Sequence, residues 1–132
     1  MPVALSRSAR MPLHRRVLPL LAVAVARVLI RWRPARIRRV LTFASRGARP
    51  ATVAQAARAR EAVVSVSLRC AGQGCLQRSI AVALLCRARG TWAMWCTGVR
   101  TSPFAAHAWV EVDGQPIGEP LPAGYYRRLL SV

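Results

Sequence analysis

The segment that most restricts the fold of this chain is a run of apolar residues between two glycine-containing turns. Two glycines in CAGQGC (residues 70–75) break any preceding helix, and Gly90 ends the helix that follows. The apolar side chains of this helix cover most of its circumference: Leu76, Ile80, Ala83, Leu84 and Leu85. Because such a helix needs neighbours on nearly every side, residues 75–89 predict a buried central helix.

The second half of the chain has strand periodicity. Ala106, Ala108 and Val110 alternate with His107, Trp109 and Glu111, which predicts a strand at the start of a hairpin over residues 106–119. We also expect a strand over residues 91–99, a loop over 100–105 and a short surface element in GYYRRLL (124–130). The length of 132 residues and the apolar fraction of 54% indicate one folded domain.

The first half of the chain is expected to be helical. Residues 17–33 predict a helix that stops at Pro34, and a shorter basic helix follows over residues 35–45. Thr52 predicts the cap of a third helix over residues 53–66. The predicted organisation is therefore a disordered tail (1–14), basic N-terminal helices (15–50) and a core (51–132).

The charge is distributed unevenly along the chain. All 21 basic residues are arginine, and 14 of them lie in residues 1–60, where there is no acidic residue. Guanidinium groups pair with phosphates and carboxylates, so this half could contact an anionic membrane surface, an acidic peptide or nucleic acid. Codon bias in a GC-rich genome is an alternative origin of the arginines.

An apolar stretch from Val17 to Ile30 raises the question of a membrane segment. Its fourteen residues fall short of the roughly 20 needed to span a bilayer. Arg15 and Arg16 before the stretch also fit a signal peptide. Apolar residues continue beyond the expected cleavage position, which favours a retained amphipathic helix that can rest on a membrane or a partner. We expect a cytoplasmic protein, with peripheral membrane contact as an option.

The four cysteines do not have the spacing of a metal site. Cys75 and Cys86 lie about 16 Å apart on one helix at 1.5 Å per residue, so one tetrahedral ion cannot reach both. We therefore predict no metal and no cofactor. Cys70 could form a disulfide in an exported chain, whereas Cys86 and Cys96 are expected to be buried thiols.

Cys75 differs from the other cysteines because it starts the central helix. The helix dipole and unpaired N–H groups there favour the thiolate and can also hold an oxyanion, and Gln73 could add a side-chain donor. Outside the tail, His107 is the only imidazole, so it is the candidate base for thiol chemistry. The alternatives are an ordinary small residue at a helix start and a packed strand histidine.

The segments GCLQRSIAVALLCRARG, TGVR and FAAHAWVEVDGQPIGE together resemble the leader peptidase of lasso-peptide biosynthesis. This enzyme is a small member of the transglutaminase-like cysteine protease group, and the resemblance covers about residues 53–120. It implies a papain/transglutaminase-like α+β core with the nucleophile at Cys75 and the base at His107. The family's third residue, an aspartate, corresponds here to Glu119.

The resemblance also implies partners. A precursor peptide would be the substrate, a separate protein would recognise its leader, and a lasso cyclase would act on the product. The competing hypothesis is a basic binding module whose residues 15–60 contact nucleic acid or an anionic membrane without catalysis. No nucleic-acid motif supports it, so we consider nucleic acid the weaker partner.

The hairpin allows two registers with opposite consequences for Glu119. A two-residue loop at Asp113 and Gly114 pairs Val112 with Gln115. Glu119 then falls opposite Ala108, on the strand face that does not carry His107. A three-residue loop places Glu119 directly opposite His107. The proposed chemistry favours the second register, with Asp113 as a turn residue and a reserve orienting group.

Overall fold

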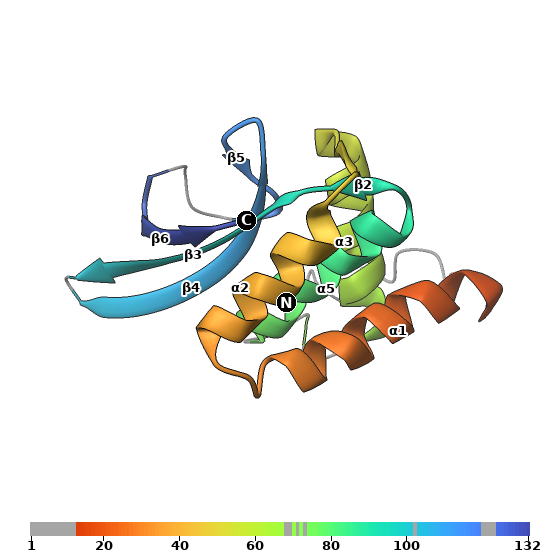
Figure 1. Cartoon of the computed structure of the whole chain (residues 1–132), viewed down its shortest axis with the longest axis horizontal. Helices are drawn as coiled ribbons and strands as arrows, with labels where there is room; N and C mark the ends of the chain where they lie inside the picture. The colour runs from red at the N-terminus through yellow and green to blue at the C-terminus, as the bar shows by residue number, and fades with distance from the viewer. Residues whose placement is uncertain (1–12, 68–69, 71, 73, 102, 120–123) are drawn as a thin grey trace, which may run out of the picture.

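The computed structural model describes residues 13–67, 70, 72, 74–101, 103–119 and 124–132. In this part of the chain, helices pack on one side of a central helix and an antiparallel sheet packs on the other, so the predicted α+β class is confirmed (Figure 1). Of the tail predicted over residues 1–14, residues 1–12 lie outside the described residues. Leu13 and His14 belong to the first helix.

The described helices are α1 (Leu13–Leu29), α2 (Pro34–Ser45), α3 (Val53–Val66) and α5 (Cys75–Ala88). α3 begins at the predicted cap, where Thr52 Oγ1 accepts from the Gln55 N–H and the Gln55 side chain accepts from the Thr52 N–H. α1 ends at Leu29 and not at the predicted Arg33, which is extended before Pro34. Proline disfavours helix in the residue before it and suits the first helical turn, so Pro34 starts α2.

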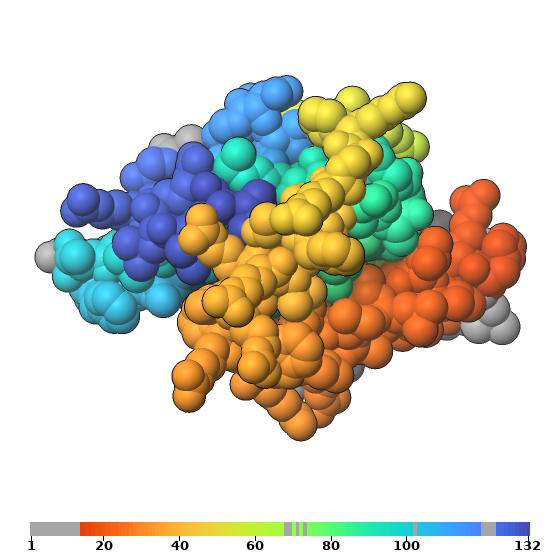
Figure 2. Space-filling view, in the orientation of Figure 1, coloured from red at the N-terminus to blue at the C-terminus, as the bar shows by residue number. Residues whose placement is uncertain are grey.

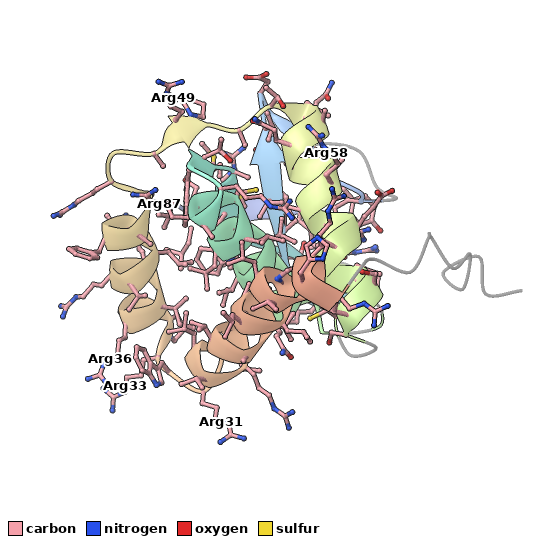
Figure 3. The ribbon with its side chains drawn as sticks, turned by 90° about the vertical axis from the view of Figure 1, so that its right-hand side faces the viewer. Arg31, Arg33, Arg36, Arg49, Arg58 and Arg87 are labelled. Atoms are coloured by element: carbon pink, nitrogen blue, oxygen red, sulfur yellow. The ribbon has the colours of Figure 1, made fainter. Side chains whose placement is uncertain are left out.

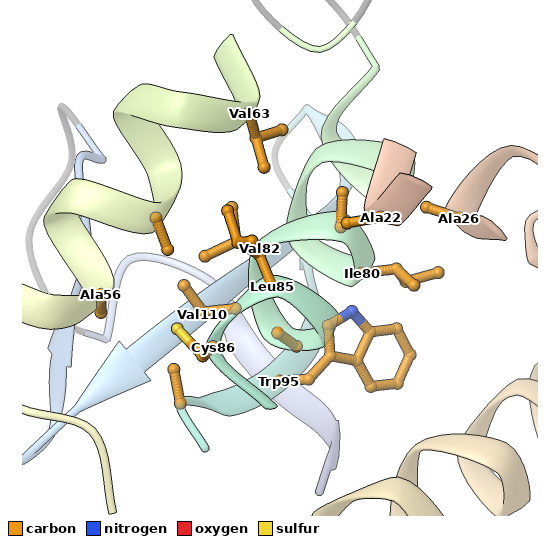
Figure 4. Packing of buried hydrophobic residues seen from close by; sticks show 14 of the residues in the cluster. Ala22, Ala26, Ala56, Val63, Ile80, Val82, Leu85, Cys86, Trp95 and Val110 are labelled. Atoms are coloured by element: carbon orange, nitrogen blue, oxygen red, sulfur yellow. The ribbon is translucent and has the colours of Figure 1, made fainter. Parts of the chain in front are cut away.

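The central helix α5 is enclosed, as predicted. Its residues Ile80–Ala83 are at most 1% exposed, and α1, α3 and β4 (Phe104–Val112) all contact it. Figure 4 shows Val63 of α3, Ala22 of α1 and Val110 of β4 around Val82 and Leu85. This packing holds the N-terminal end of α5 in a fixed position relative to the sheet.

The sheet is antiparallel, in the order β5-β4-β3-β6. Its other strands are β3 (Met94–Thr101), β5 (Gln115–Pro116) and β6 (Arg127–Ser131). A separate parallel pair joins β1 (Arg49–Pro50) to β2 (Thr91–Trp92). The short C-terminal element predicted in GYYRRLL is thus the edge strand β6, paired with β3.

Two strand boundaries differ from the prediction. The single strand expected over residues 91–99 is split at Ala93, because β2 pairs with β1 whereas β3 belongs to the sheet. The loop expected over residues 100–105 is wrong, since β3 and β4 stay paired as far as Thr101 and Phe104. Pro103 made this stretch look like a long loop, but backbone pairing continues to Thr101 opposite Phe104.

Among the described helices, none is long and apolar enough to cross a membrane. The space-filling view shows α1 and α2 as the lower part of the molecule, with the end of the β3–β4 hairpin at the opposite side from the start of α1 (Figure 2). The sheet and α1 therefore present separate surfaces.

Candidate active site

Cys75 is the first residue of α5, and its half-buried side chain points toward the sheet. Gly74 precedes it without a side-chain cap, and the first helical hydrogen bond runs from the Arg78 N–H to the Gly74 carbonyl. The pKa of the Cys75 thiol is lowered, chiefly by a hydrogen bond with His107, against the opposing effect of burial. The Ala108 backbone and the Arg78 charge lower the pKa further. The site therefore favours a thiolate.

His107 lies on β4 between the thiol and a carboxylate. Its Nε2 donates to Oε1 of Glu119 at 2.7 Å, which leaves Nδ1 for the Cys75 sulfur. The hydrogen bond with Cys75, then that with Glu119, raises the pKa of His107 to about 9, although burial opposes this. The ring is therefore positively charged near neutral pH and pairs with the thiolate.

Two aromatic rings stack with the imidazole of His107 and restrict its orientation. Trp109 stacks with it at a centroid distance of 5.9 Å, and Tyr126 stacks at 5.0 Å. Trp109 is itself fixed, because its Nε1 donates to Glu111 Oε1 at 2.8 Å and Arg128 binds the other oxygen of that carboxylate. Trp109 shares the predicted strand face with His107, whereas no local pattern indicated the approach of Tyr126.

The route by which Glu119 reaches His107 differs from the expected one. Val112 pairs with Gln115, and Asp113 and Gly114 both have positive φ, so the loop has two residues. The favoured three-residue register is therefore wrong. If β5 stayed paired with β4 as far as Glu119 in this register, the Glu119 side chain would face away from the imidazole.

Gly118 resolves this conflict. β5 ends at Pro116, and Gly118 adopts a left-handed φ of 66°, so the chain leaves the strand path before Glu119. The carboxylate is thereby redirected to the face of β4 that carries His107. Asp113 lies exposed in the hairpin turn and serves as a turn residue there. Gln73, the other candidate oxyanion donor, lies outside the described residues.

Two arginines that the sequence analysis did not select lie beside this group. Arg78 is 9% exposed and donates to the carbonyls of Cys70 and Gly72, at 3.0 and 3.1 Å, which anchors these two residues to α5. The Arg60 side chain lies against Gly118. Burial lowers the pKa of Arg60 and the nearby Arg78 lowers it further, whereas Glu119 raises it. Spacing along the chain gave no signal for either contact.

A cavity of about 630 Å³ opens next to His107 and Glu119. Its wall combines aromatic rings with four guanidinium groups and two carboxylates, namely Trp109, Tyr126, Arg60, Arg78, Arg127, Arg128, Glu111 and Glu119. Aromatic surface and cations together suit a polypeptide that carries acidic groups.

The other cysteines do not share the environment of Cys75. Cys70, Cys86 and Cys96 are buried and free, and the described residues contain no cluster of His, Cys, Asp or Glu that could hold a metal ion. Burial raises the pKa of Cys86, and it raises that of Cys96 to about 12. The Cys86 and Cys96 thiols therefore stay protonated at neutral pH.

We expect iodoacetamide to alkylate Cys75 selectively in the folded protein. The thiolate is the reactive form, and Cys75 combines exposure with a lowered pKa. Peptide mapping after partial alkylation at neutral pH should find the label on Cys75 before the three buried cysteines. Faster labelling of Cys96 would contradict this assignment, and a denatured sample provides the control in which all four react.

A comparison with protein families agrees with the α+β fold described above. Neither a curated protein nor a solved structure matches the chain. The model of the family described as "Transglutaminase-like superfamily" matches residues 19–131, which include the larger part of α1, all of α2 and the sheet. The chain belongs to the transglutaminase-like superfamily, which includes cysteine proteases and acyltransferases.

Proposed function

We propose that the protein is a cysteine endopeptidase that removes the leader from a ribosomally synthesised lasso-peptide precursor. The observation that carries the proposal is the relay from Cys75 through His107 to Glu119, built on the segments that resemble the leader peptidase. Superfamily membership supports the thiol chemistry. The substrate assignment rests on the resemblance of the motifs around Cys75 and His107.

In the proposed reaction, the Cys75 thiolate attacks the scissile carbonyl and forms a tetrahedral oxyanion. The N–H groups of the first turn of α5 have no intrahelical partners and can stabilise that charge. His107 then gives its proton to the leaving amine, which leaves an acyl-enzyme. Water, deprotonated by His107, hydrolyses the thioester, and Glu119 keeps the ring oriented through both steps.

The cavity beside His107 and Glu119, whose wall does not include Cys75, supports a peptide substrate that carries acidic side chains next to the catalytic group. Arg60 has no hydrogen bond or ion pair with any described residue, so its guanidinium can receive a carboxylate from the substrate. We further propose that a separate recognition protein grips the leader and that the lasso cyclase acts on the product. A partner that supplies affinity would let this small chain contribute the chemistry alone.

The direct test is incubation of the protein with the precursor, with and without a candidate recognition protein, followed by mass analysis. Hydrolysis yields two fragments whose masses sum to that of the precursor plus one water, whereas acyl transfer attaches the acyl fragment to an added amine. Cys75→Ala should abolish cleavage, and Cys86→Ala, which removes a buried thiol elsewhere on α5, should keep it. Cleavage that persists in folded Cys75→Ala would end the proposal.

The dependence of cleavage on pH should report the charge on His107. The thiolate–imidazolium pair exists above the lowered pKa of Cys75 and is lost as the pH rises through the His107 pKa of about 9. Glu119→Gln removes a charge that raises the His107 pKa, so the alkaline limb of kcat/KM should move to lower pH. Glu61→Gln, an exposed acid on α3, serves as the matched control and should leave the limb in place.

Substitution of Gly118 should separate the position of Glu119 from general backbone strain. In Gly118→Ala the left-handed conformation costs about 1–2 kcal/mol, and the new Cβ collides with the Arg60 side chain. We expect lower stability and slower cleavage, because Glu119 is displaced. Gly114→Ala has comparable strain at φ 77° with no neighbour within 4 Å, so it should lose stability and keep its kcat/KM. Equal cleavage rates for the two folded variants would contradict the role of Gly118.

A further inference from the structure

The half of α1 that faces solvent is apolar. Six aliphatic side chains on this helix are 45–55% exposed: Val17, Leu18, Leu20, Leu21, Val25 and Val28. The opposite side, with Ala22, Ala26 and Leu29, is buried in the core. A helix that only covers a core has polar residues toward water. We define the outer face of α1 as the six exposed side chains, and such a patch marks a surface that contacts something else.

The surroundings of the outer face carry mostly positive charge, and the acidic residue Glu61 of α3 lines a cavity together with Arg15 and Leu18. Arg15 and Arg16 lie near the start of α1, Arg27 lies in its last turn, and residues 1–60 contain no acidic side chain. Figure 3 shows Arg33 and Arg36 near the start of α2 and Arg31 below the end of α1, and all three extend away from the protein. Aliphatic groups flanked by guanidinium groups match the acyl chains and phosphates of an anionic bilayer surface.

Trp32 adds an aromatic group to the same basic stretch, between α1 and α2. It is 38% exposed, and the Arg36 guanidinium lies 5.7 Å from the centre of its ring. Tryptophan and arginine both prefer the boundary between lipid headgroups and acyl chains, where a ring and a charge can each be satisfied. Trp32 therefore places an exposed aromatic ring among the arginines of this stretch, just beyond the end of α1.

We infer that α1 docks on the surface of an anionic membrane, with its axis parallel to the bilayer and its outer face among the upper acyl chains. Anionic lipid fits this face because acyl chains can receive its aliphatic side chains while lipid phosphates pair with the arginines at both ends of α1. Docking through α1 leaves the site accessible, because the sheet packs on α5 away from α1 (Figure 1). The inference is independent of the proposed protease function.

Vesicle co-sedimentation of the full-length protein tests the inference. We expect binding to vesicles of phosphatidylcholine mixed with phosphatidylglycerol, and at least about tenfold weaker binding to phosphatidylcholine alone. Leu21→Gln/Val25→Gln should weaken binding about tenfold or more, since two buried aliphatic contacts are lost. The control Phe104→Gln/Leu129→Gln removes two exposed apolar side chains from the sheet and should bind like the wild type. Cys75→Ala should also bind normally.

Circular dichroism must first confirm that the α1 variant is folded. Two results would then overturn the inference, and a third would reassign this face. Absence of binding to the anionic vesicles at low salt excludes a membrane surface as the occupant. Equal binding by the α1 variant and the wild type shows electrostatic adsorption in which the outer face takes no part. Loss of binding to the leader-recognition protein in the α1 variant, without any vesicle binding, would assign this face to a protein partner.

Discussion

Replacement of His107 by alanine is expected to lower kcat/KM for precursor cleavage by about two to four orders of magnitude. The variant loses the group that protonates the leaving amine and deprotonates the attacking water. It also loses the largest contribution that lowers the pKa of the Cys75 thiol, so the thiolate becomes scarcer near neutral pH. Single-turnover cleavage assays with fragment masses measure the first effect, and the pH dependence of Cys75 alkylation measures the second.

The control is the other histidine of the chain. His14 lies exposed on α1, so His14→Ala should cleave the precursor at the wild-type rate. If His107→Ala, still folded by circular dichroism, retained both the rate and the alkylation profile, the imidazole would have no part in the chemistry. A loss of cleavage with unchanged alkylation would instead restrict His107 to proton transfer.

Replacement of Trp95 by alanine is expected to cost about 3–5 kcal/mol of the free energy of unfolding. The side chain is 1% exposed in the core, and its Nε1 donates to Ser79 Oγ at 3.0 Å. Alanine leaves a cavity beneath α5 and deprives the buried Ser79 hydroxyl of its donor. Because a domain of this size is stable by only about 5–15 kcal/mol, urea unfolding should show a large fall in the midpoint.

Trp95→Phe separates the two contributions. Phenylalanine keeps most of the apolar volume and loses the indole N–H, so we expect a cost of about 1–2 kcal/mol. A loss below about 1 kcal/mol in Trp95→Ala would show that the core around α5 can collapse into the space. The kcat/KM of the folded fraction should stay close to the wild-type value in both variants. The side-chain hydrogen bond of Trp95 goes to Ser79 and not to Cys75, His107 or Glu119.

The helices were the most predictable part of the fold, because their signals are local. Apolar periodicity and flanking glycines located α5, and Thr52 with Gln55 located the start of α3. The end of α1 was less predictable. Pro34 excludes helix only at Arg33, and the tertiary packing decides how many residues before Arg33 also leave the helix. The long β3–β4 pairing was missed because backbone hydrogen bonds hold Thr101 opposite Phe104 without a strong side-chain pattern.

In the candidate site, the sequence by itself determined which groups were available: a thiol at a helix start, one imidazole on a strand and an acid twelve residues later. These are properties of chain neighbours, so spacing and composition reveal them. Only the tertiary structure decided how the acid reaches the ring, because Gly118 leaves the strand path beside Arg60, which is distant in sequence. It also decided that Tyr126 stacks on His107 and that half of α1 stays exposed, since both depend on how separate elements pack.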